Sequence, residues 1–209
     1  MKKLLALMVL CGSLVGCGTT TSQQRMRHIL INTASNDYGC KGVVYSSRYL
    51  ITAKHCTSGK SHHGTFYYSR SYLGKGIRTP VLWRSDTHDL SILRINSPKN
   101  TPLKLAVNPT KGMNVFMWDG KKFLKGPLVA VNKTIYGYKK VHLARFKVIK
   151  GMSGSGVFND MGELVGIVSH SWPTKTHPRP YRYTVIQPAH EIVKGLKAIK
   201  KKHASVAQW

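Results

Sequence analysis

Three short stretches of the sequence carry side chains that could act together in nucleophilic catalysis. An apolar run in "YLITAKHC" leads into His55, Asp89 opens the apolar run in "HDLSILRI", and "KGMSGSGVF" places Ser153 among three glycines. A serine nucleophile needs these partners, because histidine takes and returns its proton and a buried aspartate orients the imidazole. Each stretch alone is unspecific, but their joint occurrence at expected strand ends indicates a catalytic triad.

Two of these positions have a competitor nearby in the sequence. Ser155 lies in the same loop as Ser153, and glycine and serine are ordinary turn residues, so the loop alone does not choose between the two hydroxyls. Asp86 lies close to Asp89 but lacks the apolar run that follows Asp89. The residue pattern therefore favours Asp89 and leaves both serines open.

The segments that must position these residues are mostly short β-branched or aromatic runs, punctuated by Gly, Ser, Asn and Pro. Examples are "GVVYS" and "LSILRI" in the first half and "MNVFMW" and "ELVGIVSHS" in the second. Strands at this even spacing predict an all-β protein of antiparallel barrels or a sandwich. After Pro188, the apolar residues Ile192, Val193, Leu196 and Ile199 recur at helical spacing and predict one amphipathic C-terminal helix.

These motifs resemble those of trypsin/chymotrypsin-like serine proteases. "TAKHC" is similar to the family's Thr/Ser-Ala-Ala-His-Cys, "HDLSIL" to its Asp-Ile-x-Leu-Leu, and "GMSGSGVFNDMGELVGIVSH" to its Gly-Asp-Ser-Gly-Gly-Pro segment and following strands. The last motif is closer still to the Gly-Asn-Ser-Gly-Ser of bacterial glutamyl endopeptidases. The resemblance implies two antiparallel six-stranded barrels with a C-terminal helix. It also implies a serine endopeptidase with His55 as general base, Asp89 as orienting carboxylate and Ser153, rather than Ser155, as nucleophile.

The same resemblance assigns roles to backbone amides and cysteines. The amides of Gly151 and Ser153 are expected to form an oxyanion hole for the charge that develops on the scissile carbonyl. Cys40 precedes Cys56 by sixteen residues, the family's spacing for a disulfide beside the histidine, and an oxidising compartment favours such a bridge. Met152 replaces the aspartate of the family's zymogen switch, so we expect activity without that switch.

Substrate specificity is expected to depend on four residues around the primary pocket. In this fold the pocket floor lies six residues before the nucleophile, which here is Lys147, and the later strand supplies Ser169, His170 and Ser171 as walls. A lysine would repel Lys and Arg side chains and attract a carboxylate. Val168 stands where the glutamyl endopeptidases place a histidine. We therefore expect no trypsin-like cleavage and a preference for Asp or Glu.

The chain begins with a bacterial export signal. Two lysines precede the apolar run 4–10, and the tract ends at "LVGC", too short for a permanent membrane span. A cysteine directly after Gly16 resembles the lipobox of bacterial lipoproteins, which implies cleavage before Cys17 and lipid, such as palmitate, on that residue. A plain secretory signal is the alternative. Gly18, in place of an inner-membrane retention aspartate, favours the outer membrane, facing the periplasm.

The sequence is strongly basic, with 33 Lys and Arg against 7 Asp and Glu. Removal of Lys2 and Lys3 with the signal leaves 31 basic and 7 acidic residues, a net charge of +24. Such a chain attracts polyanions and anionic surfaces, for example envelope phosphates. Nucleic acid is one possible polyanion, but the sequence carries no nucleic-acid-binding motif and therefore does not favour this partner. The lysines of the C-terminal helix form either a solvated face or a face for an anionic partner.

The expected organisation is one peptidase domain behind a lipid anchor. Its segments are the signal peptide 1–16, the lipidated Cys17 and tether 17–26, the peptidase domain 27–202 with barrels over 27–100 and 101–187 and a helix over 188–202, and a tail 203–209. No cofactor or metal is expected, since the adjacent His62 and His63 lack Cys or carboxylate partners. The alternatives to an enzyme are a protease-fold binding module and a basic envelope lipoprotein that binds polyanions.

Overall fold

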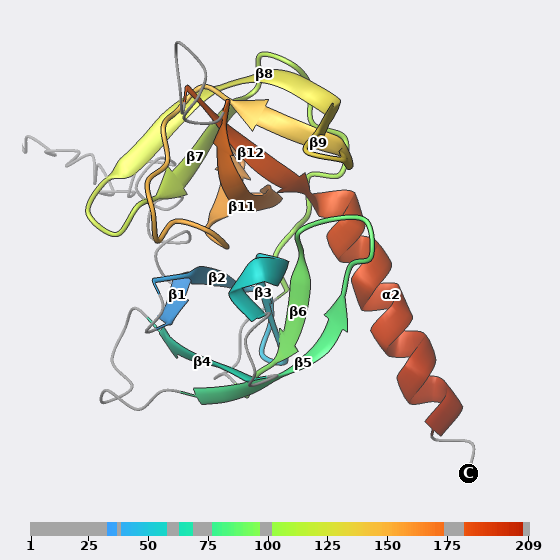
Figure 1. Ribbon diagram of the computed structural model, residues 1–209. Coiled ribbons are helices and arrows are strands. Elements are labelled where there is room, and N and C mark those ends of the chain that lie inside the picture. The colour runs from blue at the N-terminus through green and yellow to red at the C-terminus, as the bar shows by residue number, and fades with distance from the viewer. Residues whose placement is uncertain are drawn as a thin grey trace, which may run out of the picture.

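The computed structural model describes residues 33–36, 39–57, 63–68, 77–96, 102–173 and 182–206. The predicted signal peptide, Cys17, the tether and His62 lie outside the described residues. Figure 1 shows two β-barrels, one above the other, with a long helix that leaves the second barrel and runs along the side of the first. In the described part of the chain, no helix is both long and apolar enough to cross a membrane.

The first barrel consists of six antiparallel strands and carries the predicted histidine and aspartate. Its strands close in the order β1-β2-β3-β6-β5-β4. They are β1 (Thr33–Asn36), β2 (Lys41–Val44), β3 (Tyr49–Thr52), β4 (His63–Tyr68), β5 (Ile77–Arg84) and β6 (Ser91–Arg94). A short 3₁₀ helix, η1 (Lys54–Thr57), directly follows β3. Thr52 at the end of β3 pairs with Ser91 at the start of β6, so η1 and the loop before β6 lie side by side.

The second barrel repeats this architecture and carries the predicted nucleophile. Its strands close in the order β10-β11-β12-β9-β8-β7, which confirms the predicted pair of six-stranded barrels. They are β7 (Asn114–Trp118), β8 (Phe123–Ile135), β9 (Tyr138–Ala144), β10 (Gly156–Asn159), β11 (Leu164–Trp172) and β12 (Tyr183–Pro188). The loop before β10 lies against β11, because the Gly154 amide donates to the Val168 carbonyl and the Val168 amide donates to the Ser155 carbonyl.

The two barrels share an apolar cluster. Adjacent strand residues face opposite sides, so Leu50 of β3 packs inside the first barrel while Ile51 packs toward the second. The shared cluster joins Ile51 to Phe158 of β10 and to Ile192 of the C-terminal helix. The junction between the barrels is therefore a continuous core, which fixes the relative position of the loops that carry the site.

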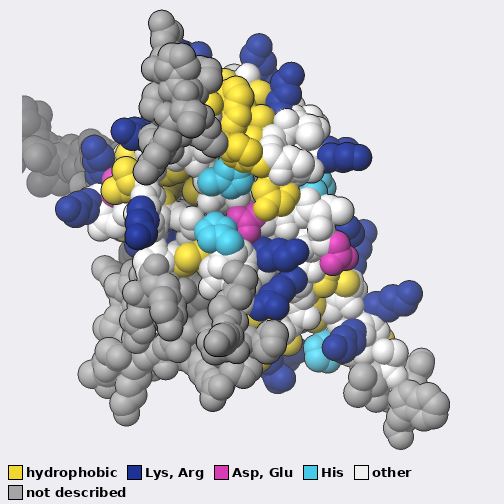
Figure 2. All heavy atoms as spheres, in the orientation of Figure 1, with side chains coloured by type: hydrophobic (Ala, Val, Ile, Leu, Met, Phe, Trp, Pro, Cys, Tyr) yellow, Lys and Arg dark blue, Asp and Glu magenta, His cyan; other side chains and the backbone are white. Residues whose placement is uncertain are grey.

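The C-terminal helix, α2 (Ala189–Val206), packs closely on the first barrel. A Cβ at Gly195 would lie 2.5 Å from the Trp83 ring and 2.7 Å from Ile92, so only glycine permits this approach. The helix extends beyond the expected end at residue 202, because no glycine or proline interrupts the residues that follow. Its lysines are all exposed: Lys194, Lys197, Lys200, Lys201 and Lys202. Figure 2 shows basic side chains, in dark blue, on this part of the surface.

Candidate active site

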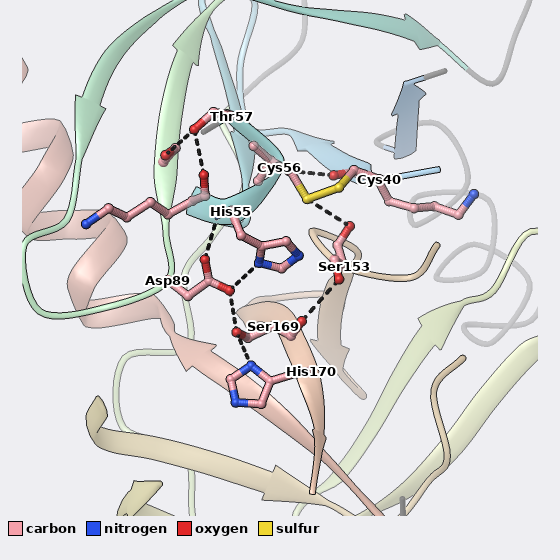
Figure 3. A network of polar contacts seen from close by, with 12 residues as sticks. Cys40, His55, Cys56, Thr57, Asp89, Ser153, Ser169 and His170 are labelled. Atoms are coloured by element: carbon pink, nitrogen blue, oxygen red, sulfur yellow. Dashed lines mark hydrogen bonds and ion pairs between the residues drawn. A yellow bond between two sulfur atoms is a disulfide. The ribbon is translucent and has the colours of Figure 1, made fainter. Parts of the chain in front are cut away.

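A cleft of about 970 Å³ brings together residues from both barrels. Its lining includes His55 from η1 and Asp89 from the loop before β6, and it includes Ser153 from the loop before β10. Figure 3 shows the His55 ring between the Asp89 carboxylate and Ser153. The structure therefore brings the three residues of the predicted triad together.

His55 and Asp89 make a two-point contact. Nδ1 of His55 lies 2.7 Å from Oδ2 of Asp89, and the His55 backbone amide donates to Oδ1 over 2.9 Å. The Asp89 side chain is 5% exposed and the His55 side chain is 48% exposed. A buried carboxylate thus holds one edge of a ring that reaches the cleft, and Figure 3 shows the other edge facing Ser153.

This contact shifts the pKa of both groups. The hydrogen bond to Asp89 raises the pKa of His55 above its ordinary value, although burial acts in the opposite direction. Burial alone would raise the pKa of Asp89, but hydrogen bonds from His55 and Ser169 outweigh it and hold that pKa below its ordinary value. Asp89 is therefore ionised at neutral pH, and His55 accepts a proton more readily than an isolated histidine.

Ser169 of β11 links Asp89 to a second histidine. Its hydroxyl oxygen lies 2.5 Å from Oδ2 of Asp89 and 2.6 Å from Nδ1 of His170. An ionised carboxylate only accepts, so the single Ser169 proton belongs to the bond with Asp89, and Nδ1 of His170 donates to Ser169. Burial lowers the pKa of His170, so at neutral pH this ring is neutral and its lone pair is on Nε2.

The loop before β10 presents Ser153 to the cleft. The Ser153 hydroxyl donates to the Ser169 carbonyl over 3.1 Å, and the Ser153 carbonyl accepts from the Lys41 amide over 2.7 Å. Gly154 has φ of +85°, and a Cβ there would lie 2.0 Å from the Lys41 carbonyl oxygen and 2.4 Å from Thr52 Oγ1. Only glycine fits this position, which lets the serine loop lie directly against the first barrel.

Two backbone amides of this loop are not used by the fold. The amides of Met152, Gly154 and Ser155 donate to backbone carbonyls, whereas those of Gly151 and Ser153 donate to no group among the described residues. Gly151 has φ of +92°, a conformation that glycine adopts readily. These are the two amides predicted for an oxyanion hole, and they are available to bind a carbonyl oxygen.

The structure separates the two serines of the loop. Ser155 is 2% exposed and does not line the cleft. Its hydroxyl has no hydrogen-bond partner within the described segments. Of the two, only Ser153 reaches the cleft, which agrees with the preference for Ser153 over Ser155.

The predicted disulfide between Cys40 and Cys56 is confirmed, with Cα atoms 6.0 Å apart. It joins the residue before β2 to η1, the element that carries His55. Sγ of Cys56 also lies 3.9 Å from the Ser153 carbonyl oxygen. The bridge therefore lies between the histidine segment and the serine loop, as Figure 3 shows.

All four predicted pocket residues line the cleft: Lys147, Ser169, His170 and Ser171. Lys147 is exposed, however, and so lies at the rim instead of at a buried floor. Its neighbours Phe146 and Val148 are buried in the core of the second barrel. Because successive residues of an extended chain face opposite sides, Lys147 faces outward.

Sequence reasoning missed two tyrosines that also line the cleft, Tyr136 and Tyr138. Their ring centroids lie 4.6 Å and 6.0 Å from that of His170. They flank Gly137 in the turn between β8 and β9, where Tyr136 and Gly137 both have positive φ. The "YGY" stretch between two strands is a hairpin-turn signal. It does not indicate which surface the turn contacts.

Met152 holds the serine loop by apolar packing. It is 5% exposed and belongs to a cluster that includes Val148, Val157 and Val165. Its sulfur also accepts a long contact of 3.4 Å from the Ile149 amide. The position where the family's zymogen switch has an aspartate is thus part of a core in this chain.

Residues 40–167 match the sequence profile of the trypsin-like peptidase domain, and this range includes His55, Asp89 and Ser153. The chain belongs to the trypsin-like peptidase family. Comparison with curated proteins finds no match. The family assignment agrees with the resemblance of the motifs, whereas the glutamyl endopeptidase likeness of the serine loop stays a prediction.

Several solved structures of bacterial proteases are similar in fold to this chain. The HtrA-type protease AlgW with a tripeptide has a TM-score of 0.68 and 16% identity, over 84% of this chain and 62% of that chain. The Yersinia pestis serine endoprotease has a TM-score of 0.67 and 18% identity, over 87% and 66%. A mutant of Rv3671c from M. tuberculosis H37Rv, in its inactive form, has a TM-score of 0.63 and 19% identity, over 85% of this chain and 90% of that chain. The likeness establishes the fold. This trypsin-like chain spans 51% to 62% of the AlgW chains.

Proposed function

We propose that this protein is a serine endopeptidase with Ser153 as nucleophile, His55 as general base and Asp89 as orienting carboxylate. One observation carries the proposal: a buried carboxylate, its histidine and a serine hydroxyl converge on one cleft. Beside them are two amides that donate to no described group. The structures of AlgW with a tripeptide and with a decapeptide show peptide bound to a protein of this fold, and support a peptide substrate.

Catalysis begins when the Ser153 hydroxyl rotates from the Ser169 carbonyl toward Nε2 of His55. Because Nδ1 of His55 donates to Asp89, Nε2 carries the lone pair that removes the Ser153 proton. The serine oxygen bonds to the scissile carbonyl carbon, and the amides of Gly151 and Ser153 stabilise the resulting oxyanion. His55 then gives its proton to the leaving amine, and a water molecule releases the acyl group through a second oxyanion.

A fluorophosphonate probe, which reacts with activated serines, tests this assignment. The wild-type chain should be labelled, and Ser153→Ala should lose both labelling and peptide cleavage while it keeps its fold. Ser155→Ala is the matched control, because it removes a neighbouring buried hydroxyl without a described partner. Activity that survives Ser153→Ala and disappears in Ser155→Ala would contradict the assignment of the nucleophile.

A binding module on the same fold is the second candidate function. It is favoured by the excess of 33 basic over 7 acidic residues and by the exposed lysines of α2. Such a protein would hold an acidic partner or an envelope polyanion without cleaving it. A wild-type chain that never reacts with the probe, but binds anionic vesicles in a salt-dependent manner, would support this function over the enzyme.

We further propose that lipid on Cys17 attaches the protein to a bacterial membrane, at the outer membrane and facing the periplasm. The support is the predicted export signal, an apolar stretch that ends in "LVGC" and is followed by Gly18. Growth with a labelled fatty acid should label the wild-type protein, and Cys17→Ser should lose the label. Unlipidated wild-type protein in the soluble periplasm would contradict the anchor.

The cleft also supports a proposal about the substrate side chain. Lys147 and Lys150 both line it, and the only acidic residue in its described lining is Asp89. Asp89 is occupied by His55 and Ser169, so it is not available to attract a cationic substrate. We propose that the enzyme disfavours Lys and Arg at the cleavage site and favours Asp or Glu.

A further inference from the structure

A second group of histidine and carboxylate side chains lies behind Asp89, outside the cleft. His88 precedes Asp89 in the loop between β5 and β6, and His190 and Glu191 begin α2. We call these three residues the His-His-Glu cluster. One nitrogen or oxygen atom from each lies within 4.8 Å of the others. His88 is 6% and Glu191 is 4% exposed, whereas His190 is half-buried, so the group lies at the edge of the interior.

Both ring nitrogens of His88 have a hydrogen-bond partner, and Nδ1 also faces Glu191. Nε2 of His88 lies 2.7 Å from the Lys139 carbonyl, which can only accept, so Nε2 carries a proton. Nδ1 therefore carries the lone pair and accepts from the Thr87 hydroxyl over 3.0 Å, and this hydroxyl can rotate away when a cation binds. The same Nδ1 lies 3.6 Å from Oε2 of Glu191, beyond hydrogen-bond distance. Two ligand atoms on one tetrahedral zinc ion with bonds near 2.0 Å are about 3.3 Å apart, so this separation fits a shared metal ion.

The other carboxylate oxygen of Glu191, Oε1, is bound by two neighbouring side chains. The Ser85 hydroxyl donates to Oε1 over 2.6 Å, and Lys194 Nζ lies 3.4 Å from the same atom. Lys194 is 60% exposed, so its ammonium can move into solvent when another cation binds. Oε2 is left facing His88. A histidine that donates to a carbonyl and a carboxylate held by a hydroxyl are the outer contacts that usually support metal ligands.

His190 completes the set from the first turn of α2. Its ring centroid lies 6.2 Å from that of His88, edge-on at 89°. Within the described segments, neither ring nitrogen of His190 takes part in a hydrogen bond. Figure 1 shows the start of α2 beside the loop between β5 and β6. These two segments carry the three side chains of the cluster.

We propose that the His-His-Glu cluster binds a zinc ion, with Nδ1 of His88, a ring nitrogen of His190 and Oε2 of Glu191 as protein ligands and water in the fourth position. Two nitrogens and one carboxylate oxygen are a ligand set that suits zinc. The ion would bind Oε2 of Glu191, which makes no hydrogen bond with a described residue, and would replace the Thr87 hydroxyl at Nδ1 of His88. It would tie α2 to the loop that carries Asp89. This proposal does not depend on the proposed peptidase activity.

Zinc titration of the chelator-treated full chain tests the site by calorimetry. We expect one zinc ion per chain and, at free zinc near 100 times Kd, a rise in Tm of about 5–10 °C. Cobalt(II) in place of zinc should give the visible absorption bands of a tetrahedral site with nitrogen and oxygen ligands. Absence of binding, or the spectrum of octahedral cobalt(II), would overturn the proposal in favour of a simple contact between His88 and Glu191.

Variants locate the ion. His190→Gln and Glu191→Gln should each lower zinc affinity by more than about 100-fold. Ser85→Ala should lower it by about 10- to 100-fold, because it removes the hydrogen bond to Glu191 and the acceptor of the Thr87 and His88 amides. His203→Gln, an exposed histidine of the same helix, is the matched control and should bind as the wild type does. The Tm of each variant without metal shows whether the variant folds. If a variant of a ligand residue fails to fold, Ser85→Ala still tests the site, because it keeps all three ligands. Unchanged affinity in folded ligand variants, or in Ser85→Ala, would overturn the site.

Discussion

The hydroxyl oxygen of Ser169 lies 2.5 Å from Oδ2 of Asp89, and this contact joins the two barrels at the cleft. Asp89 precedes β6 of the first barrel, whereas Ser169 belongs to β11 of the second. The same Oδ2 faces Nδ1 of His55 at 2.7 Å. The second barrel therefore helps to set the ionisation of the pair in the first barrel, and a change at Ser169 should alter His55.

Ser169→Ala should lower kcat/KM for peptide hydrolysis by about 10- to 100-fold. It removes one of the hydrogen bonds that stabilise the Asp89 carboxylate, and a bond to a charged group is worth about 1.5–3 kcal/mol. The pKa of Asp89 should rise, and the pH–rate profile should change with it. Ser171→Ala is the control, because it lines the same cleft but its hydroxyl donates to the Val148 carbonyl. An unchanged profile in Ser169→Ala would contradict the role of this contact.

Peptidase activity should rise with pH through a midpoint above 6.5. His55 must be neutral to accept the Ser153 proton, and the hydrogen bond to Asp89 raises the pKa of His55 above its ordinary value of 6.5. Asp89→Asn removes the negative charge and should move the acid limb of kcat/KM to lower pH, with a large loss of rate. The measurement is kcat/KM from pH 5 to 9, and a wild-type midpoint below 6.5 would count against the assignment.

The free energy of unfolding should depend on pH in a different range from peptidase activity. A raised folded-state pKa means that His55 stabilises the fold below 6.5, and that this contribution is lost as pH rises through the folded-state pKa. Asp89 has a lowered pKa, so its contribution is present above 3.8 and is lost as pH falls through the folded-state value. Urea unfolding should therefore show a larger gap between wild type and Asp89→Asn at pH 5.5 than at pH 9.

The sequence predicts the parts of the site that depend on local order. His55 follows a strand, Asp89 precedes one and Ser153 lies in a glycine loop, and each position follows from the residues beside it. The Cys40–Cys56 bridge follows from family spacing. What the sequence does not predict depends on contacts between distant segments: the Tyr136 ring against His170, and the meeting of α2 with the loop before Asp89.

Side-chain direction is the other limit of the sequence-based prediction. Family alignment places Lys147 at the pocket, and the residue does line the cleft. The alignment does not show that Phe146 and Val148 are both buried, which turns Lys147 outward. The helix end at Val206, beyond the expected residue 202, has a similar origin, since the lysine-rich end contains no residue that stops a helix.

Met152→Ala should destabilise the fold by about 2–5 kcal/mol, because it removes a buried side chain from the core beside Val148, Val157 and Val165. Met152→Asp, which introduces the residue of the family's zymogen switch, should be worse, since it places a charge in that apolar cluster. Urea unfolding measures both. Met161→Ala is the control, as Met161 is 76% exposed. Wild-type stability in Met152→Asp would show that the loop is not held by this packing.

Loss of the Cys40–Cys56 bridge should lower the free energy of unfolding by about 3 kcal/mol, the value that loop entropy gives for a closed loop of this size. Activity should fall too, because the bridge holds η1 beside the serine loop. Urea midpoints of the wild type and of the Cys40→Ala, Cys56→Ala double variant measure the first effect. Two alkylatable thiols at Cys40 and Cys56 in protein purified from the envelope would contradict the bridge itself.

Cleavage after Lys or Arg should be poor, and cleavage after Asp or Glu should be preferred. Like charges 4 Å apart cost about 1 kcal/mol in water and about 4 kcal/mol at an effective dielectric of 20. Lys147 is exposed, so the lower value applies, roughly a fivefold penalty in kcat/KM that weakens as salt is added. Lys150 lines the same cleft and acts in the same direction. A peptide library that varies the residue before the cleaved bond measures this preference.

Charge reversal at the rim separates this local effect from the net charge of the protein. Lys147→Glu should shift the preference from acidic toward basic residues. Lys197→Glu makes the same change in net charge on the exposed face of α2, which does not contribute to the described lining of the cleft, and should leave the preference unchanged. Wild-type cleavage mainly after Lys or Arg would contradict both parts of the prediction. Cleavage after apolar residues would contradict only the acidic preference, and would mean that Tyr136 and Tyr138, instead of the rim lysines, select the substrate.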